Sequence, residues 1–340
     1  MARLKRILTI DGGGIRGIIP AQVLVALEQK LKQHSGNDNA RIADYFDLIA
    51  GTSTGGILTC IFLCPEQGAD RPRFSAQQAV DLYIQNGDRI FDIPLWHRMR
   101  TGGGLLDEKH PSDGLQAVLS EYLGDLCLSD LLRPCLITAY DIRNRRAMFF
   151  TQHDARQAAS HDFALSDVCR ATSAAPTYFE AAKIASKMEV DFPLIDGGVF
   201  ANNPTMCAYA EARKLFGVGA AEMAILSLGT GVDRKSYPYE DAKDWGLAGW
   251  IKPVIDIMMS GIGETVDYQV RQIFDSVERP QQYLRINVEL VRLPADASTD
   301  LDDASPANLR HLRAMGIEAT QVPHGQSDPL DAFARLLVDE

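Results

Sequence analysis

A serine with glycines at fixed spacing is the first feature of this sequence that could do chemistry. Ser53 lies in "DLIAGTSTGGIL" (residues 47–58), which contains the pattern G-x-S-x-G. In serine hydrolases this pattern holds the nucleophile on a strained turn between a strand and a helix, where small neighbours avoid a clash. An apolar run precedes the turn and a helix-like run follows it. Ser53 is therefore predicted to be a nucleophile.

A second glycine run, "DGGGIRG" (residues 11–17), also lies between a predicted strand and a predicted helix. Its spacing matches the G-x-G-x-x-G dinucleotide fingerprint, but that motif needs an acidic residue at the end of the second strand, which here ends in "LIAGTS". Bare backbone N–H groups beside a helix N-terminus suit an anion, and beside a nucleophile they form an oxyanion hole. The glycines at 12 to 14 are therefore predicted to form an oxyanion hole.

The residue that takes the serine proton is harder to find. Asp196, in "LIDGG", follows a short apolar run, and Asp-Gly alone is a common turn. Beside the other two motifs it becomes a candidate base at the same edge of the sheet. A Ser-His-Asp enzyme of the α/β-hydrolase order would need His311 or His324 instead. Neither histidine has a supporting set of residues around it.

These motifs need elements to position them, and the start of the chain provides these in alternation. Apolar runs predict strands at 6–10 and 45–51, and helical periodicity predicts helices at 18–33 and 53–64. Further segments are predicted as helices at 75–91, 114–124, 165–176, 203–216, 308–316 and 328–340, as strands at 134–142, 146–151, 192–198, 223–231 and 282–290, and as one or two helices over 246–274, broken near Pro253 or Gly261/Gly263. The alternation predicts an α/β fold with a parallel sheet.

Composition narrows the function classes. The 340-residue chain carries 34 basic and 45 acidic residues, a net charge of −11, and no basic run, so a nucleic-acid partner is not expected. The six cysteines fit no paired zinc spacing and are expected to be buried free thiols. The N-terminus lacks a signal-peptide core, and no run of 18 apolar residues predicts a membrane span. The expected location is the cytoplasm, with peripheral membrane contact left open.

Several ordered blocks resemble the patatins and patatin-like phospholipases. They are "DGGGIRGIIPA", "ARIADYFDLIAGTSTGG", "SAAPTYFEA", "LIDGG", "LSLGTG" and "DDASPANL", and the resemblance runs from about residue 5 to the C-terminal helix. It implies a three-layer α/β/α fold with a central, mostly parallel sheet. It also implies one domain over 5–340, with a catalytic core at about 5–232 and a helical and strand extension at 233–340. One departure is Asp-Gly-Gly at 196–198, where patatins usually have Asp-Gly-Ala.

The resemblance also implies the chemistry. Ser53 matches the nucleophile and Asp196 the base of a Ser-Asp dyad without histidine, and the glycines of the first block match the oxyanion hole. The matching positions are Gly12, Gly13 and Gly14 for the oxyanion hole, with Arg16, Gly17, Gly51, Gly55, Gly197 and Gly198 as supporting motif residues. The implied activity is that of a lipid acyl hydrolase of phospholipase A type, acting through an acyl-enzyme on lipid at a membrane or micelle interface, with no cofactor and no metal.

Alternatives remain open at this stage. A thioesterase or broad esterase would use the same motifs, and a storage or binding protein would not use them at all. Trp96 and Met99 are a possible interfacial flap. Residues Trp250, Ile257, Met258 and Met259 could line an acyl channel, although packing in the core is the favoured interpretation. The sequence contains no sign of a regulator and does not indicate an oligomeric state.

Overall fold

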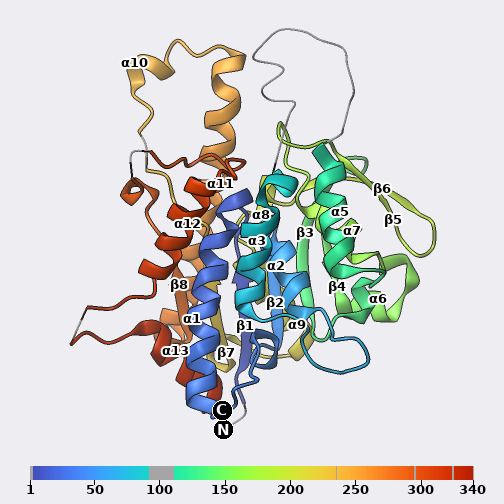
Figure 1. Ribbon diagram of the computed structural model, residues 1–340, viewed down its shortest axis with the longest axis vertical. Coiled ribbons are helices and arrows are strands. Elements are labelled where there is room, and N and C mark those ends of the chain that lie inside the picture. The colour runs from blue at the N-terminus through green and yellow to red at the C-terminus, as the bar shows by residue number, and fades with distance from the viewer. Residues whose placement is uncertain (1–2, 92–110, 235, 295, 324, 340) are drawn as a thin grey trace.

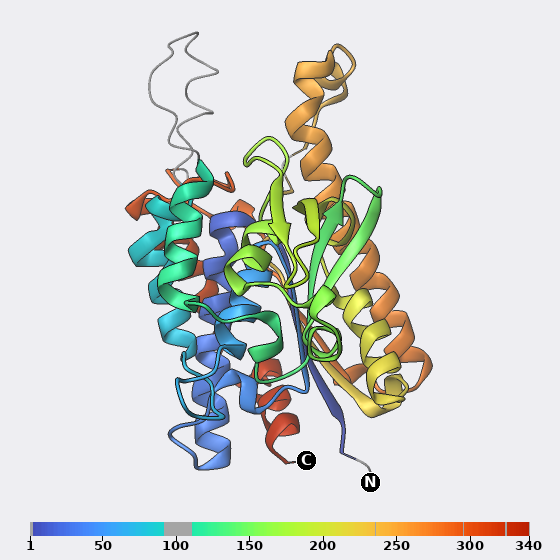
Figure 2. The ribbon, with the colours of Figure 1, turned by 90° about the vertical axis from the view of Figure 1, so that its right-hand side faces the viewer.

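A computed structural model describes residues 3–91, 111–234, 236–294, 296–323 and 325–339. These residues form an eight-stranded sheet between two layers of helices (Figures 1 and 2). The strands are β1 (Lys5–Ile10), β2 (Leu48–Thr52), β3 (Cys135–Asp141), β4 (Arg146–Thr151), β5 (Ala182–Ala185), β6 (Asp191–Asp196), β7 (Met223–Leu228) and β8 (Tyr283–Ile286). The helices are α1 (Ile18–Ser35), α2 (Thr54–Leu63), α3 (Ala76–Phe91), α5 (Pro111–Leu123), α6 (Gln152–Gln157), α7 (Leu165–Thr172), α8 (Gly198–Ala201), α9 (Thr205–Phe216), α10 (Tyr239–Ala242), α11 (Leu247–Ser276), α12 (Pro306–Glu318) and α13 (Pro329–Val338).

The sheet is mostly parallel, and helices cover both of its faces. Its order is β5-β6-β3-β2-β1-β7-β8, with β4 on the other edge of β3. The strands β3-β2-β1-β7-β8 are parallel, whereas β4, β5 and β6 form antiparallel pairs. The predicted three-layer α/β/α class is therefore confirmed. Both faces of the central parallel strands are covered, so β1, β2, β3 and β7 are buried along nearly their whole length rather than at alternate residues.

The two cores lie on opposite faces of the sheet. Leu8 and Ile10 of β1 pack in the larger core with α1, α2, α3, α12 and α13, whereas Ile7 packs in the smaller core against α9 and α11. This division follows from the period of two in a strand, which sends successive side chains to opposite faces. In Figure 2 the sheet is seen between these two layers of helices.

Helix α11 differs from its prediction. It runs from Leu247 to Ser276 without interruption, although it contains Pro253 and three glycines, at 249, 261 and 263. A proline inside a helix removes one backbone hydrogen bond, and each glycine costs about 1 kcal/mol, which a helix of this length can absorb. The predicted break near Pro253 or Gly261/Gly263 is therefore wrong. The six cysteines are free as predicted, although Cys127 and Cys207 are only partly buried.

Candidate functional site

Ser53 occupies a tight turn between β2 and α2. Its backbone angles are φ 56° and ψ −123°, a positive φ that non-glycine residues rarely adopt. The Ser53 N–H donates a hydrogen bond to the Thr172 hydroxyl at the end of α7, at 2.8 Å. A Cβ atom at Gly51 would lie 2.1 Å from the Gly55 carbonyl oxygen, and one at Gly55 would lie 2.1 Å from the carbonyl oxygen of Ile10. The turn therefore requires both glycines, because no side chain fits at either position.

Asp196 lies at the end of β6 and is 5% exposed. The Gly198 N–H donates a 2.6 Å hydrogen bond to its Oδ1 atom. Burial raises the pKa of the Asp196 carboxyl to about 6, against the opposing effect of hydrogen bonds from the Ser53 hydroxyl and the Gly198 amide. A carboxyl with this pKa is ionised at neutral pH but is a stronger base than an exposed aspartate.

The pairing of β3 explains why Ser53 and Asp196 meet. Strands β2 and β6 share one edge of β3, because β4 occupies the other. Thr52 pairs with Thr138, and Asp196 pairs with the next residue, Ala139. Since β2 is parallel and β6 antiparallel to β3, the two strands approach each other end to end. The residue after Thr52 is Ser53, so the serine and the aspartate come together at this junction.

The glycine run at residues 12–14 lies beside this junction, but its three amides differ. The Gly12 N–H donates to the carbonyl oxygen of Asn202 at 3.0 Å, so it is already occupied. Gly13 and Gly14 line the cavity that contains Ser53, and within the described ranges no acceptor is found for their N–H groups. The geometry therefore favours Gly13 and Gly14 as oxyanion donors and does not support Gly12.

Thr54 is a candidate donor that the sequence analysis did not name. It is the first residue of α2 and lines the same cavity. The N–H groups in the first turn of a helix have no acceptor within that helix. The G-x-S-x-G motif could have identified it, because the residue after the nucleophile often contributes an oxyanion donor. The Thr54 hydroxyl forms a short hydrogen bond with the Tyr83 hydroxyl of α3, which fixes the start of α2.

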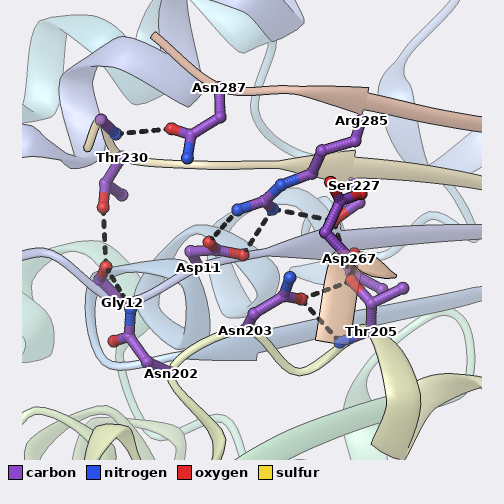
Figure 3. A network of polar contacts seen from close by, with 12 residues as sticks. Asp11, Gly12, Asn202, Asn203, Thr205, Ser227, Thr230, Asp267, Arg285 and Asn287 are labelled. Carbon is purple, nitrogen blue, oxygen red and sulfur yellow. Dashed lines mark hydrogen bonds and ion pairs between the residues drawn. The ribbon is translucent and has the colours of Figure 1, made fainter. Parts of the chain in front are cut away.

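The glycine run is anchored from behind by a polar network (Figure 3). Asp11 and Arg285 of β8 form a two-point ion pair, at 2.9 and 2.5 Å, and their side chains are 5% and 6% exposed. Burial raises the pKa of the Asp11 carboxyl, and Arg285 opposes that rise. Arg285 also donates to the Ser227 hydroxyl at 2.9 Å, and the Thr230 hydroxyl donates to the Gly12 carbonyl oxygen at 2.7 Å. Arg285 of β8 and Thr230 after β7 thus hold the run in place.

Arg16 does not line the cavity of Ser53. It is 7% exposed and lines a separate polar cavity of about 270 Å³ that also contains Asp11 and Arg285. Burial lowers the pKa of the Arg16 guanidinium. Among the charges that oppose this shift, that of Asp256 has the largest effect. Among the described residues its Nε atom finds no hydrogen-bond acceptor. Its predicted supporting role stays a prediction.

The cavity that contains Ser53 and Asp196 has a volume of about 270 Å³ and mostly apolar walls. Segments far apart in the chain contribute to these walls, including Ile57, Ile90, Leu115, Phe179, Met258 and Met259. The favoured interpretation of Trp250, Ile257, Met258 and Met259 as core residues is therefore wrong, since the two methionines line the cavity and the other two side chains are 40% and 47% exposed. The reason is that this part of α11 lies over the cavity and not over the sheet. Trp96 and Met99, the predicted flap, lie outside the described residues.

Histidine is not part of the described site. None of His34, His153, His161 and His311 lines the cavity, whereas His97, His110 and His324 lie outside the described residues. His34 contacts Asp331 and His153 contacts Glu211 instead. The part of the chain that the structure describes also contains no group of three or more His, Cys, Asp or Glu side chains that could hold a metal ion. In those same ranges no helix is long and apolar enough to cross a membrane.

Comparison with known proteins identifies the family. Residues 8–209 match the family model described as "Patatin-like phospholipase". The chain belongs to the patatin-like phospholipase family. It is 35% identical to "Patatin-like protein 2" of Oryza sativa, over 92% of this chain and 83% of that protein. It is 31% identical to "Probable inactive patatin-3-Kuras 1" of Solanum tuberosum, over 100% and 94% of the two chains.

A solved structure, that of VipD from Legionella pneumophila, matches 93% of this chain and 67% of its own at 13% identity and a TM-score of 0.33. Membership of the patatin-like family supports lipid acyl hydrolase activity in general, and thus hydrolysis of esters in lipid metabolism. One relative carries the word "inactive" in its name, so activity has to be argued from the site of each member.

Proposed function

We propose that this patatin-like chain hydrolyses fatty-acyl esters of phospholipids or related glycerolipids through Ser53 and Asp196. The observation that carries the proposal is that Ser53 and the buried carboxyl of Asp196 together line one apolar cavity. A serine nucleophile needs an adjacent base, and an acyl chain needs apolar walls, at about 0.8 kcal/mol per buried CH₂ group. Both requirements are met at one place in this fold.

The proposed reaction begins with transfer of the Ser53 hydroxyl proton to the Asp196 carboxylate. The serine oxygen attacks the ester carbonyl carbon, and the resulting oxyanion accepts hydrogen bonds from the Gly13, Gly14 and Thr54 amides. When the intermediate collapses, the ester C–O bond breaks and Asp196 returns its proton to the leaving alcohol. Water, losing a proton to the same carboxylate, then attacks the acyl-enzyme. Collapse of this second intermediate releases the fatty acid and restores the serine hydroxyl.

The extension at residues 233–340 belongs to the same proposed unit. Its strand β8 extends the sheet beside β7, and its helices α12 and α13 pack in the larger core. Met258, Met259 and Leu301 from this segment line the cavity of Ser53. These contacts support a single functional unit over residues 5–340, with the acyl cavity formed jointly by the core and the extension.

The rate of hydrolysis is expected to depend on pH through Asp196. Its carboxyl must be ionised to accept the serine proton, and its pKa is about 6. The value of kcat/KM for a water-soluble nitrophenyl ester should therefore fall as the pH drops below about 6 and level off above it. A profile measured in wild type and in His311→Ala should be the same. A midpoint that moves in His311→Ala would assign the titration to the imidazole.

The substrate class is tested by mass spectrometry of the products. A phospholipid with two different acyl chains should yield a free fatty acid and the matching lysophospholipid, and Ser53→Ala protein should yield neither. Release of acid from a thioester or short ester, but from no glycerolipid, would favour the thioesterase or esterase alternative. Release from none of these substrates would favour a non-catalytic storage or binding protein, an outcome made relevant by the name of one relative.

A further inference from the structure

The first half of α11 presents an apolar stripe to solvent. Trp250, Val254, Ile257 and Met258 are between 40% and 47% exposed. Their spacing places them on one face of the helix. In the second half of the same helix, Val270 and Phe274 are fully buried against the sheet. The helix is therefore core scaffold at one end and exposed apolar surface at the other.

Aromatic side chains gather at the exposed end. Trp245 contacts both Tyr237 and Trp250 edge to face, with ring centroids 5.4 and 5.1 Å apart. The Tyr237 hydroxyl donates to the Asp256 carboxylate at 2.9 Å, which ties the segment before α10 to α11. Tyr239 of α10 is 75% exposed. We name residues 237–260 the α10–α11 arm; Figures 1 and 2 both show α10 and the upper turns of α11 standing clear of the sheet and its helical layers.

The exposed stripe continues into the cavity of Ser53. Met258 belongs to the stripe and also lines the cavity, together with its neighbours Ile255 and Met259. An apolar path therefore leads along one helix from the outer surface to the dyad. We propose that the α10–α11 arm docks onto the surface of a lipid bilayer and delivers acyl chains from it to the cavity. This inference rests on the proposed function.

The composition of the arm favours a lipid surface over other occupants. Tryptophan and tyrosine combine an apolar ring with one polar group and concentrate at the boundary between lipid and water. Residues 237–260 include two basic and four acidic residues, so the arm carries a net charge of −2 and no excess of positive charge. Attraction to anionic lipid is therefore weak, and docking should depend on apolar insertion. Uncharged, zwitterionic vesicles should suffice, and added salt should change binding little.

The test compares vesicle binding of two double variants made in Ser53→Ala protein, which cannot consume the lipid. Val254→Ser/Ile257→Ser removes two exposed side chains of the arm that do not line the cavity. Met188→Ser/Val190→Ser is the matched control, since these side chains are 61% and 47% exposed at the turn between β5 and β6. On phosphatidylcholine vesicles, the arm variant should bind roughly ten-fold or more weakly, because two apolar side chains no longer enter the lipid. The control should bind as the parent does.

Activity separates this inference from the proposed function. With Ser53 present, the arm variant should hydrolyse a soluble ester at the normal rate but phospholipid vesicles more slowly. Tyr239→Ser, at the most exposed aromatic position of the arm, should weaken vesicle binding in the same direction if the double variant folds poorly. Equal vesicle binding by arm and control variants would overturn the docking proposal even if lipid hydrolysis is found. If the arm variants lose vesicle binding and the control variant does not, docking is supported even if the chain hydrolyses no glycerolipid.

One further outcome concerns another copy of the chain. If wild-type protein is a dimer by light scattering, the arm variant is a monomer, and vesicle binding is unchanged, the apolar stripe is an interface between two copies. That result would overturn docking on lipid.

Discussion

Asp196→Asn is expected to lower kcat for acyl-ester hydrolysis by roughly 10³–10⁴, and Ser53→Ala by at least as much, because one residue is the proposed base and the other the nucleophile. The asparagine side chain has nearly the same shape and can still accept the hydrogen bond from the Gly198 amide. Its amide nitrogen can donate to Ser53 but cannot take a proton from it. The measurement is kcat with a soluble nitrophenyl ester, which does not require lipid binding.

The double variant sharpens this prediction. Residues that act as a unit give losses that do not add, so Ser53→Ala/Asp196→Asn should be no slower than Ser53→Ala alone. A matched change on a described histidine, His311→Ala, should leave the rate unaltered, because His311 does not line the cavity. Substantial activity in Asp196→Asn together with loss in His311→Ala would contradict the dyad.

Asp196→Asn should at the same time stabilise the fold at neutral and alkaline pH. The folded pKa of about 6 lies above the ordinary value of 3.8, so the folded state binds the proton more tightly than the unfolded state. The contribution of Asp196 to the stability of the wild type is therefore greatest below about pH 4 and falls as the pH rises to 6. Removing the ionisable group should raise the free energy of unfolding at pH 8 by at most about 3 kcal/mol, with little difference at pH 4. Denaturant unfolding at both pH values measures this difference.

The sequence predicted the elements around Ser53 because their signals are local. Gly51 and Gly55 flank the serine, and the strand before it and the helix after it are contiguous in the chain. The same holds for the glycine run after β1. The pairing of Ser53 with Asp196 came from family resemblance, since nothing in "LIDGG" alone distinguishes a base from an ordinary turn.

Long-range geometry was beyond the sequence patterns. A short apolar run predicts a strand but not its direction, so the antiparallel approach of β6 to the end of β2 was not predicted. The acceptor of the Gly12 amide is Asn202, a residue remote in the chain, and only the fold brings them together. Likewise the periodicity of residues 250–258 predicts an apolar helical face, but not that this face meets solvent and the cavity.

Arg285→Met is expected to give the largest loss of stability, because it leaves the Asp11 carboxylate buried without its partner. Breaking a buried ion pair from one side costs about 3–5 kcal/mol, whereas replacing both charges is often nearly neutral. Arg285→Met should therefore lower the free energy of unfolding by that amount, and adding Asp11→Asn should restore most of it. The matched control is Arg271→Met, which removes an exposed arginine paired with Asp267 and should cost under about 1 kcal/mol.

The loss of stability in Arg285→Met should be smaller at low pH than at high pH. Without Arg285, the opposing effect is lost, and burial together with the charge of Asp267 raises the pKa of Asp11 further. Protonation then relieves the buried charge, so the variant should regain stability as the pH falls through the folded pKa of Asp11, and lose it as the pH rises through that pKa. Because Asp11 adjoins the glycine run, kcat should fall with the fold still intact, while KM for a soluble ester changes little. A double variant as unstable as Arg285→Met, or a loss that does not vary with pH, would show that Arg285 acts through packing and not through its charge on Asp11.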